Sequence, residues 1–434
     1  MSQCNAVSGG TPAFLDELRW RGFLDAVTSD SLDDFLAAGR RTMYVGFDPT
    51  ADSLHLGSLI PVMALAHAQR RGHRPLVLVG GGTGLIGDPS GKASERTLLT
   101  KEKSEENAAA IRVQLSHFFD LSSDDRALML NNVEWLARLN LVDFLRDIGK
   151  HFSVNEMIKR DSVRTRLEER DQGISFTEFS YMLLQAYDFL YLCQRHDCTI
   201  QMGGSDQWGN IVAGKDLIRR ILGQRSEGIT FPLLTTSSGK KFGKTEEGAV
   251  WLDARRTSPY QMYQYWLQTA DADAVRYLKL FTFLDAERIA ALETEVAERP
   301  AQREAQRVLS AECTALIHGT ETVRAVEAAS RILFSSSIEV PRPETVAMLA
   351  AEVPVTNMTA ADLQARVPLV GLLVRTGLAA SKGEARKLIE AGGVYVNNQR
   401  ENQPQKTVSL EDLQWPGAIL LRAGKKNYHL VRIL

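Results

Sequence analysis

Short apolar runs alternate with longer stretches of helical spacing through the first half of this 434-residue chain, and this alternation restricts its fold more than any other feature. The runs of strand length, each bounded by glycine or polar residues, are 42–46, 75–80, 127–130 and 198–202. The stretches with helical spacing are 59–71, 103–119, 176–195 and 211–222. Strands and helices in alternation predict an α/β fold, a Rossmann-like doubly wound parallel sheet with helices on both faces.

The composition changes after about residue 250, and this change divides the chain further. Residues 258–333 are rich in Ala, Glu, Arg and Leu at helical spacing, as in a separate helical domain. Prolines typical of a linker then follow at Pro341, Pro343, Pro354 and Pro368. The predicted parts are a disordered tail (1–12), a Rossmann-like domain (13–250), a helical domain (251–338), a linker (339–365) and a small α+β domain (366–434).

The charge balance limits how the chain could bind nucleic acid. A formal net charge of −2 gives no overall attraction to a polyanion, so any such contact needs a local patch. Residues 366–434 hold eleven Lys or Arg against five Asp or Glu, a surplus of six. The cysteines, Cys4, Cys193, Cys198 and Cys313, lack metal-ligand spacing, and the polar N-terminus resembles neither a signal peptide nor a membrane anchor. We therefore expect reduced thiols, no bound metal and a cytoplasmic protein.

Two glycine-rich motifs suggest other nucleotide-binding folds. Residues 82–87 satisfy G-x-G-x-x-G after an apolar strand, as in an NAD-dependent dehydrogenase. Asp88 and Pro89 follow where a helix should begin, which argues against that interpretation. Residues 239–245 are one residue short of P-loop spacing, and no core strand precedes them, so a P-loop nucleotidase is also disfavoured.

A histidine and a glycine, His55 and Gly57, stand where the helical stretch 59–71 begins. Unpaired N–H groups and the macrodipole favour phosphate at a helix start. Alone, this pattern would suit a surface turn with Ser58 as an N-cap. With its prefix Asp48-Pro49-Thr50, however, the stretch 44–57 resembles the first signature of class I aminoacyl-tRNA synthetases in their bacterial tyrosyl form. Ser58 stands where that signature usually has a second histidine.

The same resemblance extends to the lysine-rich segment 241–245, which is similar to the second signature, a mobile loop whose ammonium groups neutralise pyrophosphate. The resemblance implies ATP contacts from Gly46, Asp48, His55, Gly57, Ser58, Gly204, Asp206 and Lys244. It implies stabilisation of the departing pyrophosphate by Thr50, His55, Lys92, Arg96, Lys241, Lys244 and Thr245. Mg²⁺ would accompany ATP as a substrate, and no permanently bound cofactor is expected. No general base is needed, because a carboxylate is ionised near neutral pH.

Three polar side chains, Tyr181, Gln185 and Asp188, recur at i, i+4 and i+7 in an apolar helical stretch and so share one face. A buried carboxylate needs a donor, which could come from the core or from a bound phenol hydroxyl. The resemblance implies that Tyr44 and Asp188 hold the hydroxyl of tyrosine. It further implies that Asp88, Tyr181 and Gln185 bind the α-ammonium group, Gln207 the carboxylate and Asp206 the ribose. Asn132 and Trp135 match a further family segment.

Residues 367–398 read as two short helices and a strand with clustered basic side chains. They resemble the αL RNA-binding module shared with a small-subunit ribosomal protein, in which Arg375, Lys382, Arg386 and Lys387 would contact phosphates. The alternative is a charged helix face paired with Glu384 and Glu390.

The whole resemblance implies a homodimeric tyrosine-tRNA ligase with a catalytic domain at 13–250 and an anticodon-side domain at 251–338. Such an enzyme forms tyrosyl-adenylate and pyrophosphate from L-tyrosine and ATP, then transfers tyrosine to the 3′ end of tRNA(Tyr). The alternative from another class is an RNA-binding regulatory or splicing factor on a retired synthetase scaffold.

Overall fold

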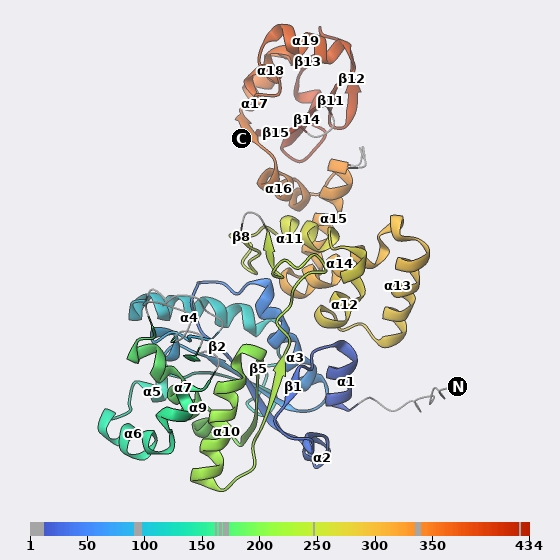
Figure 1. Ribbon diagram of the computed structural model, residues 1–434. Coiled ribbons are helices and arrows are strands. Elements are labelled where there is room, and N and C mark those ends of the chain that lie inside the picture. The colour runs from blue at the N-terminus through green and yellow to red at the C-terminus, as the bar shows by residue number, and fades with distance from the viewer. Residues whose placement is uncertain are drawn as a thin grey trace. The chain divides into compact units, whose positions relative to one another are not determined.

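The computed structural model describes residues 13–90, 98–160, 163–164, 167, 173–245, 248–334, 340–424 and 427–434 (Figure 1). The chain forms two compact units. The first comprises Met1–Thr257 with Gln268–Leu309, and the second comprises Ser258–Leu267 with Ser310–Leu434. The predicted tail, 1–12, lies outside the described residues. The five-part division stays a prediction.

A six-stranded sheet with the order β1-β6-β5-β2-β3-β4 forms the centre of the first unit. Its strands are β1 (Ala26–Val27), β2 (Thr42–Phe47), β3 (Arg74–Val79), β4 (Leu128–Asn131), β5 (Cys198–Gly204) and β6 (Glu227–Phe231). Every neighbouring pair is parallel except β1 and β6, which are antiparallel. The doubly wound α/β prediction is confirmed. The predicted strands correspond to β2, β3, β4 and β5.

Helices pack on both faces of this sheet. The helices of the first unit are α1 (Phe14–Arg21), α2 (Leu32–Ala37), α3 (Leu59–Arg70), α4 (Lys101–Ser116), α5 (Val133–Leu136), α6 (Leu141–Asp147), α7 (Val154–Ile158), α9 (Phe176–His196), α10 (Trp208–Leu222), α12 (Asp271–Phe281) and α13 (Ala286–Glu298). On one face, Tyr44, Leu76 and Leu78 share a core with α5, α9 and α10. On the other face α3 contacts the central strands, and α1 and α12 pack against α3. Buried on both faces, these strands are almost continuously apolar.

The order of the strands positions the site. The chain builds outward from β2 through β3 to β4, and then returns to place β5 on the other side of β2. The connections therefore diverge between β2 and β5, whose register aligns Tyr44 with Gln201. Ligands of open α/β sheets bind at such a switch point, beyond the carboxyl ends of the strands.

The second unit contains a five-stranded sheet with the order β12-β11-β14-β15-β9 and helices from two parts of the chain. Its helices are α11 (Pro259–Leu267), α15 (Thr320–Phe334), α16 (Pro343–Glu352), α17 (Ala360–Gln364), α18 (Leu369–Arg375) and α19 (Lys382–Glu390), and α14 (Glu304–His318) contributes residues to both units. Its strands are β9 (Val355–Met358), β10 (Val367–Pro368), β11 (Val394–Val396), β12 (Gln399–Glu401), β13 (Thr407–Val408), β14 (Ala418–Ala423) and β15 (Asn427–Ile433). The two short helices and strand expected over 367–398 are α18, α19 and β11.

The stretch predicted as a linker is folded in its described part, 340–365. It forms α16, β9 and α17, and Leu349 and Leu363 are buried in two cores of this unit. Two of the prolines stand where elements begin. Pro343 occupies the first turn of α16, where a missing N–H costs no helical hydrogen bond, and Pro354 directly precedes β9. Among the described residues, no helix is both long and apolar enough to cross a membrane.

Candidate functional site

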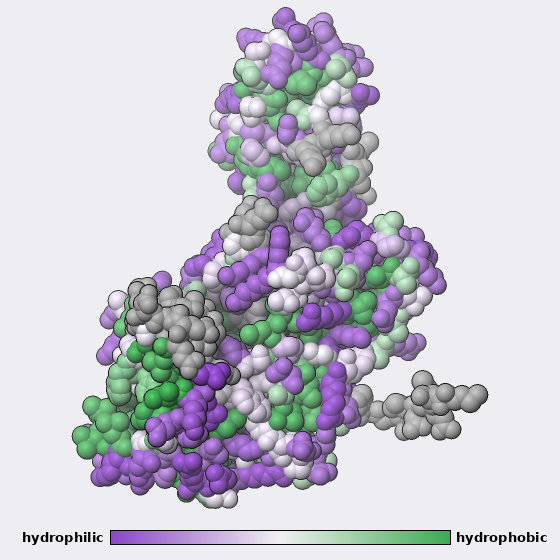
Figure 2. All heavy atoms as spheres, in the orientation of Figure 1, coloured by the Kyte–Doolittle hydropathy of each residue, from purple (hydrophilic) through white to green (hydrophobic). Residues whose placement is uncertain are grey.

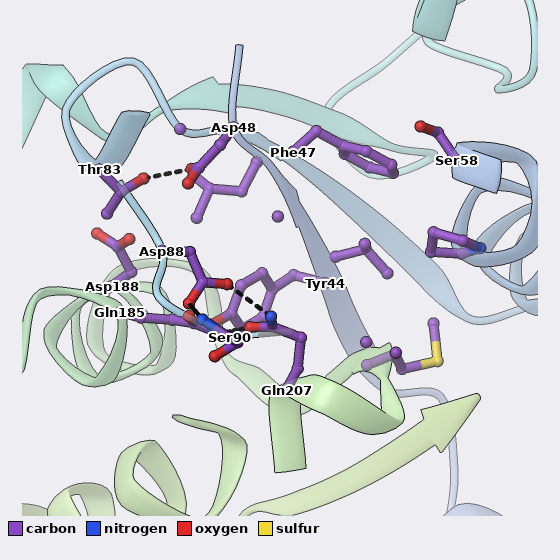
Figure 3. A pocket seen from close by; sticks show the side chains of 18 of the residues that line it. Tyr44, Phe47, Asp48, Ser58, Thr83, Asp88, Ser90, Gln185, Asp188 and Gln207 are labelled. Atoms are coloured by element: carbon purple, nitrogen blue, oxygen red, sulfur yellow. Dashed lines mark hydrogen bonds between the residues drawn. The ribbon is translucent and has the colours of Figure 1, made fainter. Parts of the chain in front are cut away.

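A cavity of about 330 Å³ lies at the carboxyl ends of β2 and β5. It brings together most of the side chains predicted to bind tyrosine and ATP (Figure 3). The predicted residues that line it are Tyr44, Gly46, Asp48, Thr50, His55, Ser58, Asp88, Tyr181, Gln185, Asp188, Gly204, Asp206 and Gln207. The segments that contribute them are far apart in the sequence, so the fold has gathered them into one space.

Helix α9 carries three of these side chains into the cavity. It begins where the Ser175 hydroxyl accepts a hydrogen bond from the Glu178 amide, and it ends at Asp197, which adopts a left-handed conformation. Within these caps the spacing of Tyr181, Gln185 and Asp188 directs all three toward the strands. The predicted shared face is therefore present.

At one end of the cavity the Asp188 carboxylate is almost fully buried, at 1% exposure. One of its oxygens accepts a hydrogen bond from the Trp135 indole at 2.7 Å, and the other accepts one from Asn132 at 2.8 Å. Burial raises the pKa of Asp188 to about 8, while these two hydrogen bonds act in the opposite direction. The indole is held in turn by stacking on Tyr191, with ring centroids 4.3 Å apart.

The Tyr44 hydroxyl is also buried, and it has no hydrogen-bond partner among the described residues. Burial and then the nearby charge of Asp188 raise the pKa of Tyr44 well above its ordinary value. A buried hydroxyl without a partner is costly. A ligand hydroxyl placed between Tyr44 and Asp188 could provide the missing hydrogen bond.

Carboxylates also surround Tyr181 at the opposite end of α9's polar face. The Tyr181 hydroxyl donates to Asp48 at 2.8 Å. Burial, followed by the charges of Asp48 and Asp88, raises the pKa of Tyr181 well above its ordinary value. This concentration of negative charge favours a cationic ligand group such as an ammonium. Asp48, which we assigned to ATP from the sequence, is thus bonded directly to a residue of the predicted tyrosine set.

An amide network fixes the next group of side chains. Gln207 donates to Asp88 at 2.7 Å, and its carbonyl oxygen accepts from Gln185 at 3.2 Å. Asn210 donates to Gln185 at 2.9 Å and to Gln207 at 3.2 Å. The Ser90 amide donates to the other oxygen of Asp88 at 2.9 Å. Sequence reasoning missed Asn210 and Ser90, because each is an ordinary polar residue that only the fold places here.

The glycine-rich segment serves the polar network instead of a dinucleotide. The Gly82 amide donates to Asn132 at 2.7 Å, and the Gly81 amide donates to Asn131 at 3.1 Å. A side chain at Gly81 would collide with Asn131. These N–H groups are therefore unavailable for a pyrophosphate, and a single 3₁₀ turn (Thr83–Leu85) follows where a dehydrogenase needs a helix.

Thr83 joins the two ends of the cavity and was also missed. Its hydroxyl donates to Asp48 at 2.7 Å (Figure 3). The same hydroxyl accepts from Asn132 at 2.9 Å. Asn132 also bonds Asp188, so a continuous chain of hydrogen bonds runs from Tyr181 to Asp188. The one feature of the sequence that could have pointed to Thr83 was its position inside the glycine motif at 82–87.

The two predicted phosphate-binding segments lie against each other. Gly243 has a φ of +73°, and a side chain built on it would come within 3.2 Å of the Gly57 amide nitrogen. A bridge between His55 and Trp251 continues this contact. Ser58 makes no side-chain capping hydrogen bond with α3, so its hydroxyl does not act as the N-cap considered above. Figure 3 shows Ser58 across the cavity from Asp188, on the side of α3.

The remaining predicted residues divide into three groups. Lys241 and Lys244 are exposed and do not line the cavity. Burial is the main cause of a raised pKa at Asp206, and the charge of Lys241 acts in the opposite direction. Lys92, Arg96 and the Thr245 side chain lie outside the described residues. The predicted RNA contacts are all exposed in the second unit, and they are Arg375, Lys382, Arg386 and Lys387. Glu384, their suggested partner, accepts a hydrogen bond from the Ala380 amide.

No group of three or more His, Cys, Asp or Glu side chains could hold a metal ion within the part of the chain that the structure describes. The cavity therefore presents carboxylates, hydroxyls and amides at one end and a helix start with His55 at the other. This arrangement suits a zwitterion with a phenol beside a polyphosphate.

Comparison with known proteins gives a consistent family. Residues 37–335 match the model of class I tRNA synthetases (W and Y), and residues 345–431 match the tyrosine-tRNA ligase SYY-like C-terminal domain. The tyrosine-tRNA ligase of Roseiflexus castenholzii is 51% identical over 422 residues, covering 97% of this chain and 99% of the relative. That of Desulfosudis oleivorans is 51% identical over 429 residues, covering 96% and 98%.

A solved structure agrees with these sequence relatives. The C-terminally truncated mitochondrial tyrosyl-tRNA synthetase of Aspergillus nidulans is 34% identical, with a TM-score of 0.67. The match covers 75% of this chain and 95% of that structure.

The buried carboxylate predicts a specific pH dependence of stability. The pKa of Asp188 is about 8 in the folded chain, against about 3.9 when unfolded. Its stabilising contribution is therefore complete below about pH 4 and is lost as the pH rises through about 8. Asp188→Asn should remove this loss. The free energy of unfolding of the variant minus that of the parent should therefore increase by about 1 kcal/mol per pH unit between about pH 5 and 8.

Urea unfolding at several pH values measures this difference. Asp143→Asn is the matched control, because Asp143 is an exposed carboxyl on α6. Parallel curves for the parent and Asp188→Asn would show that Asp188 does not take up a proton on folding.

Proposed function

The chain belongs to the tyrosine-tRNA ligase family of class I tRNA synthetases, and from this premise we propose that the cavity between β2 and β5 activates L-tyrosine with ATP. The product is tyrosyl-adenylate, with release of pyrophosphate, and tyrosine is then transferred to the 3′ end of tRNA(Tyr). The observation that carries the assignment to this cavity is the pairing of a buried carboxylate, Asp188, with the partnerless hydroxyl of Tyr44.

In the proposed binding mode the phenol of tyrosine lies between these two groups. Its hydroxyl donates to Asp188 and accepts from Tyr44, so phenylalanine would leave both buried groups without that partner. The α-ammonium group binds at Asp88, Tyr181 and Gln185, where the carboxylates supply the compensating charge. The amide nitrogen of Gln207, already directed at Asp88, is placed to receive the substrate carboxylate.

The first step is a displacement at phosphorus. A carboxylate oxygen of tyrosine attacks the α-phosphorus of ATP, a new O–P bond forms, and the bond to pyrophosphate breaks. Because the attacking group is already ionised, the protein has to position the reactants and stabilise the charge on the leaving group. We assign that role to Thr50 and His55 beside the start of α3, and to Lys92, Arg96, Lys241, Lys244 and Thr245. ATP enters as its Mg²⁺ complex.

The nucleoside of ATP is assigned to glycines and polar groups that line the same cavity, and to Gly57, which lies between the lining residues His55 and Ser58. Gly46, Gly57 and Gly204 allow close approach, and Asp206 binds the ribose. Ser58 replaces the histidine usual at its position and presents a hydroxyl that does not cap α3.

For the second step we propose that tRNA phosphates contact the second unit. The exposed cations Arg375, Lys382, Arg386 and Lys387 are held on α18 and α19, whose buried residues anchor both helices in the core of that unit. We propose a cytoplasmic location, which the free thiols of Cys193, Cys198 and Cys313 support. The retired-scaffold alternative is disfavoured, because the polar network around Asp188 and Asp88 has no use in a protein that only binds RNA.

We further propose that the protein is a homodimer, with the apolar end of the first unit facing a second copy. Figure 2 shows apolar side chains gathered over α6. Leu141 and Val142 are each 70% exposed, and Leu145, Val154 and Ile158 are exposed nearby in sequence on α6 and α7. Apolar patches of this kind mark interfaces between proteins.

Amino-acid-dependent exchange of pyrophosphate into ATP tests the activity. Tyrosine should support exchange and phenylalanine should not. Asp188→Asn should lower kcat/KM for tyrosine by about 10- to 100-fold, because the amide NH2 would face one of the donors that now bond the carboxyl group, Asn132 or Trp135. The loss for phenylalanine should be much smaller. Asp143→Asn serves as the control.

If no amino acid supported exchange but the protein still bound tRNA, the result would favour an RNA-binding factor on a retired synthetase scaffold. Unaltered discrimination between tyrosine and phenylalanine in Asp188→Asn would remove this residue from the pocket.

The dimer is tested by Leu141→Asp combined with Val142→Asp, measured by analytical ultracentrifugation. A dimeric parent and a monomeric variant are expected, because burying two carboxylates in an apolar contact is unfavourable. Val113→Asp is the control, since Val113 is 61% exposed on α4. A variant that remains dimeric would place the interface elsewhere.

A further inference from the structure

Helix α12 presents a row of side chains to the segment that contains the lysine signature. Asp273, Tyr277 and Phe281 are spaced four residues apart, so they lie along one face of this helix. Each of them contacts the hairpin formed by residues 234–242. We propose that Asp273 is a positioning residue for adenylate formation, which holds Lys241 at the phosphate end of the cavity by fixing this hairpin. This inference rests on the proposed function.

The tip of the hairpin is held by Asp273. The hairpin closes through hydrogen bonds between Thr236 and Lys240, and its tip contains Ser237. The Asp273 carboxylate accepts from the Ser237 amide at 2.9 Å and from the Ser237 hydroxyl at 2.8 Å. Asp273 is only 5% exposed, so these hydrogen bonds offset the cost of burying its charge. Its carboxylate also lies in the first turn of α12, where the helix dipole favours a negative charge.

The base of the hairpin is held farther along the same face. The Phe242 ring stacks on Phe281 with centroids 5.0 Å apart, and it meets Tyr277 edge-on at 5.1 Å. Lys241 therefore stands between two fixed points, Ser237 and Phe242. On the other side of Phe242, Gly243 packs against Gly57 of the first signature and Lys244 follows. A displaced tip would move Lys241 relative to both signatures.

Helix α12 is itself anchored to the first unit. The buried Arg21 guanidinium on α1 donates to the carbonyl oxygens of Lys279, Thr282 and Leu284, which follow or end the last turn of α12. Glu17 forms an ion pair with Arg21. The hairpin is therefore held in place by a fixed helix, through Asp273.

The test compares Asp273→Asn with Asp271→Asn. Asp271 is the matched control, because it lies on the same helix with its side chain 45% exposed and bonded to Gln306, away from the hairpin. In Asp273→Asn, the tyrosine dissociation constant from equilibrium dialysis should stay within about twofold, while kcat for pyrophosphate exchange falls about 10- to 100-fold through misplaced charges. Active-site titration corrects for inactive protein. Asp271→Asn should match the parent.

A double-mutant cycle with Lys241→Ala separates positioning from general support of the fold. If Asp273 acts through the hairpin, Asp273→Asn should lower kcat for pyrophosphate exchange by less than about twofold in the Lys241→Ala background. The proposal would be overturned if Asp273→Asn lowered kcat equally in the parent and in Lys241→Ala. It would also be overturned if tyrosine binding and kcat were lost in parallel. Should Asp273→Asn not fold, Ser237→Ala on the exposed tip replaces it, with a smaller loss that must also vanish in Lys241→Ala. A parent chain without tyrosine-dependent exchange would refute the proposed function instead.

Discussion

The Asp188 carboxylate is taken out of water in the interior of the first unit, and the tyrosine end of the cavity is organised around the cost of that burial. Two donors, Trp135 and Asn132, offset part of the cost, yet its pKa still rises to about 8. A phenol hydroxyl is a further donor that can complete the arrangement. The same burial that opposes ionisation therefore makes the pocket selective for a ligand with a hydroxyl at that point.

In the proposed binding mode, a chain of hydrogen bonds sets the separation between the two ends of the bound amino acid. It runs from Tyr181 through Asp48, Thr83 and Asn132 to Asp188. Each hydroxyl or amide in this chain restrains the groups it bonds, so the proposed ammonium and phenol positions would be fixed together. The glycine segment contributes by approaching the asparagines closely, an approach that side chains at those positions would block.

The phosphate end is built differently. The two candidate cations that the structure describes, Lys241 and Lys244, are exposed and stand outside the cavity lining, because ammonium groups are strongly hydrated and gain little from burial without a polyanion. Their positions come from backbone packing, with Gly243 against Gly57, and from α12 behind the hairpin. In the proposed mechanism, selection of the amino acid thus relies on buried groups, whereas neutralisation of pyrophosphate relies on surface charges held in place by packing.

The alternation of apolar runs and helical stretches determined the parallel sheet, and the spacing of Tyr181, Gln185 and Asp188 determined their shared face, since both follow from the repeats of strand and helix. Local pattern could not determine that Thr83 would link two carboxylates, because that contact joins segments separated by 35 and 49 residues. Nor did local pattern indicate the secondary structure of 340–365, where Pro343 begins α16. Which polar groups meet across a switch point is decided only when the strands pair and bring their ends to one edge.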